Sequence, residues 1–429
     1  MPLPVALRAF RSRNYRLFVG GQLVSLIGTW MQSVAQSWLI YRLTGSAALL
    51  GLIGFAGQIP IFILAPFGGV IADRVNRHRV LIATQTAMML LAFALAALTL
   101  EGFVRVWHIL ALASLLGIAN AFDIPARQAF LVEMVGREDI VNAIALSSSM
   151  MNGARIVGPA VAGLVVAAVG EGWCFLLNGL SYVAVIIALL LMTIAPRKDV
   201  HPRVSTWHSV VEGFSFAWHT RPVRALLMLL GLVSVMGMPY TVLMPIIADR
   251  TLHGGAHAYG VLMSASGSGA LAGAAMLTLR RHIRGLGRWI AVTSIGFGAS
   301  LIAFSFSRVL WLSVTLLVPA GFCMMVQMAA SNTLIQSMVP DRLRGRVMAV
   351  YSMMFMGMAP VGALLAGAIA APVGTPQTVA IGGAVCIAGG LMFGANLPHL
   401  RGRARELIVG QQVSPGLPSD DAAPVTDEA

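Results

Sequence analysis

Long apolar stretches, separated by short polar connections, make up most of this chain. A helix crosses a bilayer with about 20 mostly apolar residues, and on that measure the pattern predicts twelve membrane spans. The spans cover approximately residues 18–41, 46–72, 79–100, 106–126, 144–169, 173–195, 223–248, 257–279, 289–306, 309–333, 347–371 and 376–397. Because a helix satisfies its own backbone groups within lipid, the pattern predicts an all-α membrane protein.

The polar connections divide the spans into two groups of six. We predict an N-terminus over residues 1–17, a first bundle over 18–195, a linker over 196–222, a second bundle over 223–397 and a disordered tail over 398–429. The linker contains the segment Thr206 to Trp218, whose aromatic residues favour a helix lying on the membrane surface. The tail ends in polar and acidic residues, a composition typical of disorder.

The basic residues fall almost entirely on one side of the predicted spans. Of the 29 Lys and Arg, 24 lie in the N-terminus or near loops after even-numbered spans, four lie on the opposite side, and Arg155 lies within a span. Cytoplasmic loops carry the excess of Lys and Arg. We therefore expect both termini, the linker and the tail in the cytoplasm.

The composition excludes several other classes of protein. Hydrophobic residues make up 58% of the 429 residues and charged residues 10%, whereas a soluble domain is about 25% charged. The net charge of +13 sits in short clusters between apolar runs, which is not the pattern of a nucleic-acid partner. No cysteine pattern, Walker loop or His-Glu-x-x-His motif is present, so we expect no metal, no cofactor and no enzyme.

An internal repeat relates the two groups of spans. A constant shift of 204 positions superimposes five pairs of glycines without a gap. The pairs are Gly117 and Gly321, Gly153 and Gly357, Gly158 and Gly362, Gly163 and Gly367, and Gly170 and Gly374. Two six-span halves in the same orientation are typical of secondary transporters, which hold their substrate between the halves.

The connection between spans two and three carries a recognisable motif. It reads GGVIADRVNRHR from position 68, so that Gly69, Asp73, Arg74 and Arg77 match the pattern GxxxDRxGRR, with Asn76 in place of a glycine. This loop resembles the signature of the major facilitator superfamily. Residues 121–130 and 339–346 resemble the bacterial twelve-span exporters for enterobactin and macrolides. The resemblance implies two pseudo-symmetric six-helix bundles, in a monomer of the bacterial inner membrane.

The resemblance also implies that this loop is a conformational latch, which stabilises the state open to the outside. Asp73 would lie against the N-terminus of span eleven, where the helix dipole and Arg344 or Arg346 favour an anion. Arg77 would pair with Asp123 at the end of span four. The alternative is a basic loop that only fixes topology, but Asp123 is one of very few acids inside a span.

Small residues four apart line spans five, eight and eleven and let helix backbones approach closely. The resemblance pairs span five with eight and span two with eleven across the halves. We therefore predict surfaces on which the halves slide, with ordinary close packing as the alternative. Span five also resembles the family's antiporter signature, although Ala162 replaces one glycine. The positions are Gly158, Pro159, Gly163, Gly269, Gly273, Gly362 and Gly367.

Span one carries six polar residues within about 100° of arc, at 100° per residue. Exposing this stripe to lipid would cost several kcal/mol (about 2–7 per group), so we predict that it lines a substrate cavity rather than a helix contact. The stripe consists of Gln22, Ser25, Thr29, Gln32, Ser33 and Gln36. Further candidates on other spans are Asn120, Asn152, Tyr240, Gln327 and Tyr351.

Arg155 lies about eleven residues into span five, near 16 Å deep. A charge at that depth is expensive and marks a functional site by default. Arg155 would either attract an anionic substrate or pair with Asp123 in proton coupling, and a structural ion pair is the alternative. No acid lies in span one, which argues against a pocket for organic cations.

Together these patterns predict a proton-driven exporter that moves a small amphiphilic molecule, neutral or anionic, by alternating access. A siderophore- or drug-like substrate follows from the resemblance. A lysophospholipid flippase or solute importer of the same fold is the alternative within transport. A membrane sensor is the alternative from another class.

Overall fold

The computed structural model describes residues 5–136, 138–193, 206–279 and 285–413. Within these ranges only the backbone is described at 5–7, 65–66, 70, 72–73, 206–210 and 410–413. The first half contains η1 (Val5–Arg11), α1 (Arg13–Thr44), α2 (Ala47–Arg74), α3 (Arg77–Leu100), α4 (Val106–Val135), α5 (Ile140–Val169) and α6 (Glu171–Leu190). The second half follows α7 (Thr206–His219) and contains α8 (Arg221–Leu232), η2 (Val233–Gly237), α9 (Tyr240–Ile246), η3 (Ile247–Thr251), α10 (Gly255–Thr278), α11 (Leu286–Phe306), α12 (Leu310–Met338), α13 (Asp341–Ser352), η4 (Met353–Gly357), α14 (Met358–Val373) and α15 (Thr375–Val413).

Twelve helices in the described part of the chain are long and apolar enough to cross a membrane, which confirms the predicted number of spans. The seventh span, Arg221–Thr251, is assembled from α8, η2, α9 and η3, and the eleventh, Asp341–Val373, from α13, η4 and α14. The inserted elements η2, η3 and η4 are single π-helical turns. Such turns interrupt a helix locally and are frequent at functional positions.

Spans one and two are joined by a tight turn that follows from their sequence. Gly45 ends α1 with φ 59°, a left-handed conformation that suits glycine, and its N–H donates to the Tyr41 carbonyl oxygen. Ser46 then caps α2 by accepting a hydrogen bond from the backbone N–H of Leu49. Two residues are therefore enough to reverse the chain at this end of the molecule.

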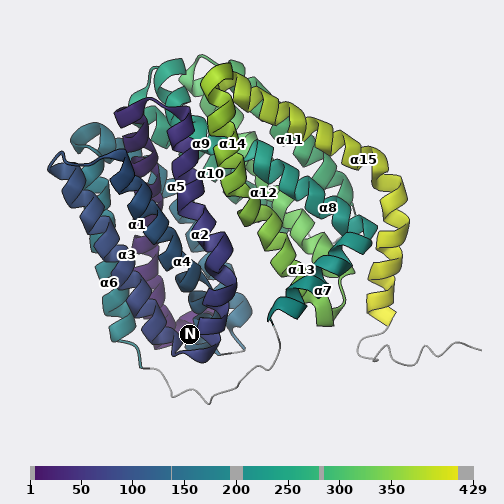
Figure 1. Cartoon of the computed structure of the whole chain (residues 1–429). Coiled ribbons are helices and arrows are strands. Elements are labelled where there is room, and N and C mark those ends of the chain that lie inside the picture. Colours follow the sequence, from purple (N-terminus) through teal and green to yellow (C-terminus); the bar gives the residue numbers. More distant parts are fainter. Residues whose placement is uncertain (1–4, 137, 194–205, 280–284, 414–429) are drawn as a thin grey trace, which may run out of the picture.

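The helices form two bundles that converge at one end and diverge at the other (Figure 1). Helices α1–α6 form the first bundle and α8–α15 the second, as the repeat predicts. The bundles meet where α5 packs on α10 and where α2 packs on α14. We name the end with the Gly45 turn the closed end, and the end with the N-terminus and the start of α13 the basic end.

The packing of α2 shows that the space between the two bundles increases from the closed end to the basic end. At the closed end, a Cβ added to Gly367 of α14 would lie 2.6 Å from the Ala47 carbonyl oxygen and 3.0 Å from the Cα of Gly51. Gly69 lies 18 residues after Gly51 and hence on the same face of α2. A Cβ at Gly69 would have nothing within 4 Å. The two bundles are thus tightly packed at the closed end and have space between them at the basic end.

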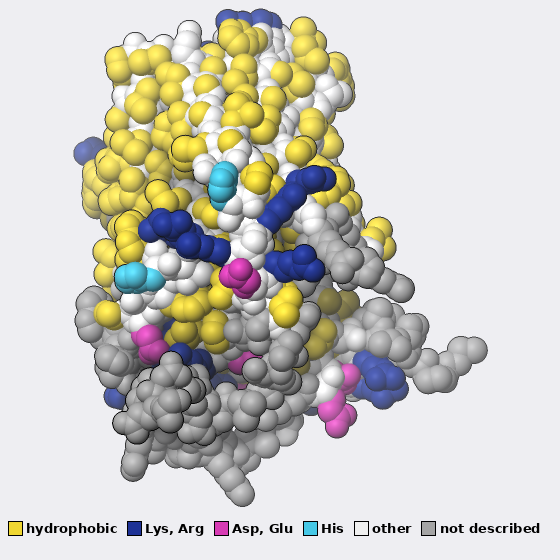
Figure 2. All heavy atoms as spheres, turned by 90° about the vertical axis from the view of Figure 1, so that its right-hand side faces the viewer, with side chains coloured by type: hydrophobic (Ala, Val, Ile, Leu, Met, Phe, Trp, Pro, Cys, Tyr) yellow, Lys and Arg dark blue, Asp and Glu magenta, His cyan; other side chains and the backbone are white. Residues whose placement is uncertain are grey.

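Two connecting segments correct or refine the predictions. The predicted linker helix is present as α7, and it packs on α13, where Glu212 pairs with Arg346. The prediction of a disordered tail from residue 398 is wrong for residues 398–413, because α15 continues through them to Val413. Figure 2 shows the face that bears α15, with hydrophobic side chains over its upper part and charged and histidine side chains gathered below.

Candidate substrate site and contacts between the bundles

A cavity of about 250 Å³ lies within the first bundle, beside the middle of α1. Its walls come from α1, α2, α4 and α6, and among the described residues Val242 of α9 is its single lining residue from the second bundle. Nine lining side chains are polar and uncharged, and no charged side chain of the described residues contributes. The lining residues are Thr29, Gln32, Ser33, Gln36, Ser37, Leu50, Ile53, Gly54, Gly57, Gln58, Ala113, Leu116, Asn120, Asn178, Tyr182 and Val242.

The predicted polar stripe of α1 divides between this cavity and the helix core. Four of its six residues line the cavity. Gln22 and Ser25 lie nearer the basic end and are only 4% and 2% exposed. The Gln22 Oε1 atom is buried without a hydrogen-bond partner among the described residues. The part of the stripe from Thr29 to Gln36 therefore lines a cavity, as predicted, whereas Gln22 and Ser25 lie in a helix contact, which was the alternative.

Hydrogen bonds hold part of the lining in place and leave part of it free. Asn178 Nδ2 donates to Gln32 Oε1 at 2.6 Å, which joins α6 to α1. The side chains of Ser33, Gln36 and Gln58 have no hydrogen-bond partner in the part of the chain that the structure describes. These three side chains can therefore bond a ligand without first breaking a bond within the protein.

Four polar lining residues were missed at the sequence level. Ser37 continues the α1 stripe by one residue, so the helical angle could have found it. Gln58 lies alone in an apolar span, whereas Asn178 and Tyr182 lie together with Ser181 on α6. A single polar residue in a span does not reveal which neighbouring helix it faces, and only the packing of α2, α4 and α6 around α1 brings these side chains together.

Of the five weaker candidates, only Asn120 lines this cavity. Asn152 is half-buried on α5 and donates to the Ser148 carbonyl oxygen. Tyr351 donates to the Met328 carbonyl oxygen at 2.9 Å, within the second bundle. Gln327 is 1% exposed. The prediction that these residues share one cavity is therefore wrong for Asn152, Gln327 and Tyr351 in this structure.

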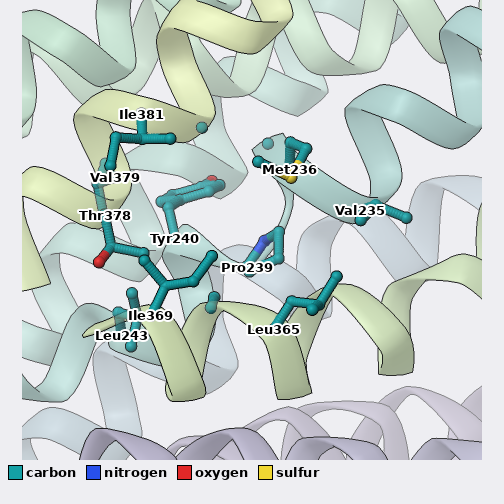
Figure 3. A pocket seen from close by; sticks show the side chains of 13 residues that line it. Val235, Met236, Pro239, Tyr240, Leu243, Leu365, Ile369, Thr378, Val379 and Ile381 are labelled. Carbon is teal, nitrogen blue, oxygen red and sulfur yellow. The ribbon is translucent and has the colours of Figure 1, made fainter. Parts of the chain in front are cut away.

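Tyr240 faces a second and much smaller space in the C-terminal bundle. Its hydroxyl lies 2.6 Å from Ser266 Oγ, and Figure 3 shows its ring between Val379 and Pro239. The volume of this space is about 20 Å³, close to what one water molecule needs. A substrate of drug size does not fit there.

Arg155 lies half-buried at the middle of α5, where its guanidinium carbon is 5.7 Å from the centre of the Trp30 ring. No acidic side chain of the described residues pairs with it. The predicted pairing with Asp123 is therefore wrong in this structure. So is the alternative of a structural ion pair, because the observed contact is a cation–π interaction.

Asp123 is fully buried in α4, and its partners differ from the predicted one. Thr84 and Gln85 of α3 each donate to Asp123 Oδ1 at 2.9 Å, and Arg127 forms the ion pair, one helical turn away on α4. Arg77 instead contacts Glu133 Oε1 at 2.9 Å. The prediction that Arg77 pairs with Asp123 is therefore wrong, although Arg77 does bridge to α4.

The other predicted latch residues are exposed, have partners close by, or have a side chain that lies outside the described residues. Arg344 pairs with Asp341 at 2.6 Å, within the first turn of α13, and Arg346 pairs with Glu212 of α7. Arg74 is exposed at the end of α2. The side chain of Asp73 lies outside the described residues, so its contact with α13 stays a prediction.

Direct bonds join the two bundles at the closed end. Tyr41 of α1 donates to Asp249 Oδ2 of η3 at 2.5 Å. Arg250 donates to the Gly45 carbonyl oxygen at 3.2 Å, and its guanidinium carbon lies 5.8 Å from the centre of the Tyr41 ring. Trp38 stacks on Tyr259 of α10, with ring centroids 6.4 Å apart. These contacts close the path between the bundles at this end.

Comparison with known proteins identifies the family of this chain. A family model described as transmembrane secretion effector matches residues 5–413, which is nearly the whole chain. The chain belongs to this family. It is a major facilitator transporter, as its sequence resemblance predicted, and not an enzyme.

Relatives of this transporter carry siderophores and drugs, according to their names. The staphyloferrin A transporter of Staphylococcus aureus is 25% identical over 379 residues, which cover 87% of this chain and 94% of that protein. The multidrug efflux pump Tap of Mycolicibacterium fortuitum is 27% identical over 363 residues, covering 82% and 88%. The enterobactin exporter EntS of Shigella boydii is 24% identical over 359 residues, covering 83% and 85%.

Solved structures confirm the fold of the transporter. The nucleoside transporter NupG superimposes with a TM-score of 0.70 at 13% identity and covers 92% of this chain and 99% of its own. A bacterial homologue of the human lysosomal transporter Spinster, solved inward-facing and unoccupied, gives a TM-score of 0.66 at 14% identity, covering 95% and 99%. At such identities the likeness concerns the fold alone.

The small residues of this transporter lie at helix contacts, but only some of those contacts join the two bundles. A Cβ at Gly163 would lie 3.1 Å from the Ala256 carbonyl oxygen of α10, and the Pro159 carbonyl oxygen packs on Gly260. With Gly367, these residues form the interface between the bundles.

The remaining small residues pack within one bundle, so their predicted role in sliding is wrong. Gly158 packs on Trp30 of α1, and Gly362 packs on Val235 of η2. Gly269 and Gly273 of α10 both face α12. The stripe on α10 that meets the first bundle includes Gly260 and Gly267 instead.

Proposed function

We propose that this transporter is a proton-driven exporter of a small amphiphilic molecule, neutral or anionic, which it moves by alternating access. The observation that carries the proposal is the cavity of about 250 Å³ beside α1, with nine uncharged polar side chains inside a membrane-spanning bundle. Polar groups are costly in the membrane interior. A polar cavity of that size therefore indicates a place for a polar solute. The names of the relatives favour a siderophore- or drug-like substrate.

The alternating-access part of the proposal rests on the unequal ends of the molecule. The closed end has the Tyr41–Asp249 bond and the Gly367 contact, whereas Gly69 has open space beside it at the basic end. The excess of arginines at the basic end favours a cytoplasmic location for that end and for both termini. On this orientation, the structure corresponds to a state that receives substrate from the cytoplasm.

The latch belongs to the opposite state in this proposal. Closure of the basic end would bring Asp73 to the start of α13, where the helix N-terminus and Arg344 or Arg346 favour an anion. Arg346 would then exchange Glu212 of α7 for the loop after α2. An ion pair that is engaged in one state and replaced in the other is a suitable element for a two-state switch.

Protons are the proposed coupling ion, and the lipid bilayer and the small-molecule substrate are the proposed partners of a monomer. Asp123 supports proton coupling, because it is a fully buried carboxyl group in a membrane span. An ionisable residue at such a position is a candidate for a proton relay. Nucleic acid is not a proposed partner, since the orientation of the protein in the membrane accounts for the excess of arginines at one end.

Transport by purified protein in liposomes tests the proposal. We expect a panel of siderophores and amphiphilic drugs to contain compounds that accumulate on the side opposite the basic end when a proton gradient is imposed. Collapse of the gradient with a protonophore should abolish accumulation. Replacement of the free cavity residue Gln36 by Leu should reduce transport, whereas Gln336→Leu, outside the cavity on α12, should not. Uptake in the opposite direction, or transport that is indifferent to pH, would contradict the proposal.

A further inference from the structure

Arg155 lies at the middle of a membrane span and has no acidic partner among the described residues. Arg42 pairs with Glu171, Arg77 with Glu133 and Arg127 with Asp123, but among the described residues no carboxylate reaches Arg155. Arg155 is half-buried at the middle of a span, and its guanidinium carbon lies 5.7 Å from the centre of the Trp30 ring. An unpaired cation at that depth is costly, so an anion from outside the protein would be held there favourably.

The contacts of Arg155 place it on the inner side of its bundle. Its backbone carbonyl oxygen would lie 2.9 Å from a Cβ added to Gly267 of α10, so this part of α5 faces the second bundle and not lipid. Trp30 lies three and seven residues before Ser33 and Ser37 on α1, hence on the same side of that helix. Both serines line the cavity of the first bundle. Neither Trp30 nor Arg155 is itself a lining residue, so the pair lies beside the stretch of α1 that lines the cavity.

The cavity itself is suited to an uncharged part of a ligand. Its polar lining consists of amides and hydroxyls, and the side chains of Ser33, Gln36 and Gln58 are free to donate and accept hydrogen bonds. A charged group in that cavity would lose its hydration without gaining an opposite charge. No charged side chain of the described residues lines the cavity, and Arg155 is a positive charge beside the stretch of α1 that does.

We propose that the substrate has a single anionic group, which Arg155 binds beside Trp30, and an uncharged hydrogen-bonding body, which fits the cavity of the first bundle. This inference rests on the proposed transport function and narrows its substrate class from neutral or anionic to anionic. It assigns Arg155 to substrate binding rather than to coupling. It also assigns recognition mainly to the first bundle, since among the described residues Val242 is the single lining residue of the cavity from the second.

A matched pair of probes tests this assignment by binding, without any need for transport. N-benzoylglycylserine carries a carboxylate, and its C-terminal amide has the same body without the charge. We expect the full-length protein in detergent to bind the acid at least tenfold more tightly than the amide, a difference of about 1.4 kcal/mol. Binding would be followed by calorimetry and by tryptophan fluorescence, and Trp30→Phe should reduce the fluorescence change.

Variants separate a role of Arg155 from a general effect of charge. Arg155→Gln should remove the preference for the acid, and Arg155→Lys should keep part of it. Arg308→Gln, which removes an exposed arginine at the closed end, should leave the preference unchanged. Equal binding of acid and amide to the unmodified protein, failure of the acid to bind, or a preference retained by Arg155→Gln would each overturn the assignment. Export of neutral compounds alone would also overturn it and leave the proposed transport function intact.

Discussion

Tyr41 of the first bundle donates a hydrogen bond to the Asp249 carboxylate of the second, with 2.5 Å between the two oxygen atoms. The residues are 208 positions apart in the chain, and the bond lies at the closed end, beside the contact of Arg250 with Gly45. Arg250, next to Asp249, contacts the same tyrosine ring and the Gly45 carbonyl oxygen. At the closed end, hydrogen bonds and a cation–π contact therefore join the bundles in addition to apolar packing.

Removal of that hydroxyl should favour opening of the closed end. A hydrogen bond to a charged group contributes about 1.5–3 kcal/mol, so Tyr41→Phe should shift the ratio of closed to open molecules by about tenfold or more. The shift can be measured by labelling an engineered cysteine at Ser37 with a membrane-impermeant reagent. Tyr351→Phe, which loses a bond within one bundle, is the control, and equal labelling of the two variants would show that the bond does not hold the bundles together.

Two glycines should respond oppositely to the same small substitution. A Cβ at Gly260 would lie 2.5 Å from the Pro159 carbonyl oxygen, whereas a Cβ at Gly153 would meet nothing within 4 Å. Gly260→Ala should destabilise by about 1–3 kcal/mol through overpacking between the bundles. Gly153→Ala should stabilise by up to about 1 kcal/mol, because alanine favours a helix. Thermal unfolding in detergent checks both signs, and a stabilised Gly260→Ala would contradict the tight contact.

A double-mutant cycle can decide whether Arg127 or Arg77 forms the ion pair with Asp123. Asp123→Asn should cost about 1–3 kcal/mol, since Arg127 would lose its charged partner in a largely buried setting. Combined with Arg127→Gln, the loss should be clearly less than the sum of the two single losses. Combined with Arg77→Gln, the losses should add, because Arg77 pairs with Glu133. Coupling between Asp123 and Arg77 would instead support the pairing predicted from the sequence.

The linker helix α7 should loosen when its ion pair with α13 is removed. Glu212→Gln should increase hydrogen exchange in residues 211–219, with only about 0–1 kcal/mol lost from global stability, because both partners are partly exposed. Arg346→Gln should do the same. Arg342→Gln should have a smaller effect, since that side chain is 71% exposed and 4.0 Å from Glu212. Unchanged exchange in Glu212→Gln would show that apolar packing alone holds α7.

Much of the site could be anticipated wherever one helix carries the signal. The α1 stripe is an example, because residues three and four apart share a face of a helix, and four of its six members line the cavity. Gln58 could not be assigned, since it is a single polar residue in an apolar span. The polar residues of α6, which include Asn178, do not by themselves show which neighbouring helix they face. The prediction that Arg77 pairs with Asp123 failed for a related reason. Several arginines lie near that end of the molecule, and sequence spacing does not rank them.

The sequence by itself determined the twelve spans, their division into two repeated halves and the side on which arginines gather. These features depend on local hydropathy and charge, which determine directly how a segment is placed in a membrane. Only the tertiary structure decided which small residues join the bundles, which acid meets which arginine, and that Arg155 lies on Trp30 with no counter-ion among the described residues. Those outcomes depend on the rotation of each helix about its axis and on the angle between the bundles. Neither is encoded in a single span, because both result from side chains that pack across helices distant in the chain.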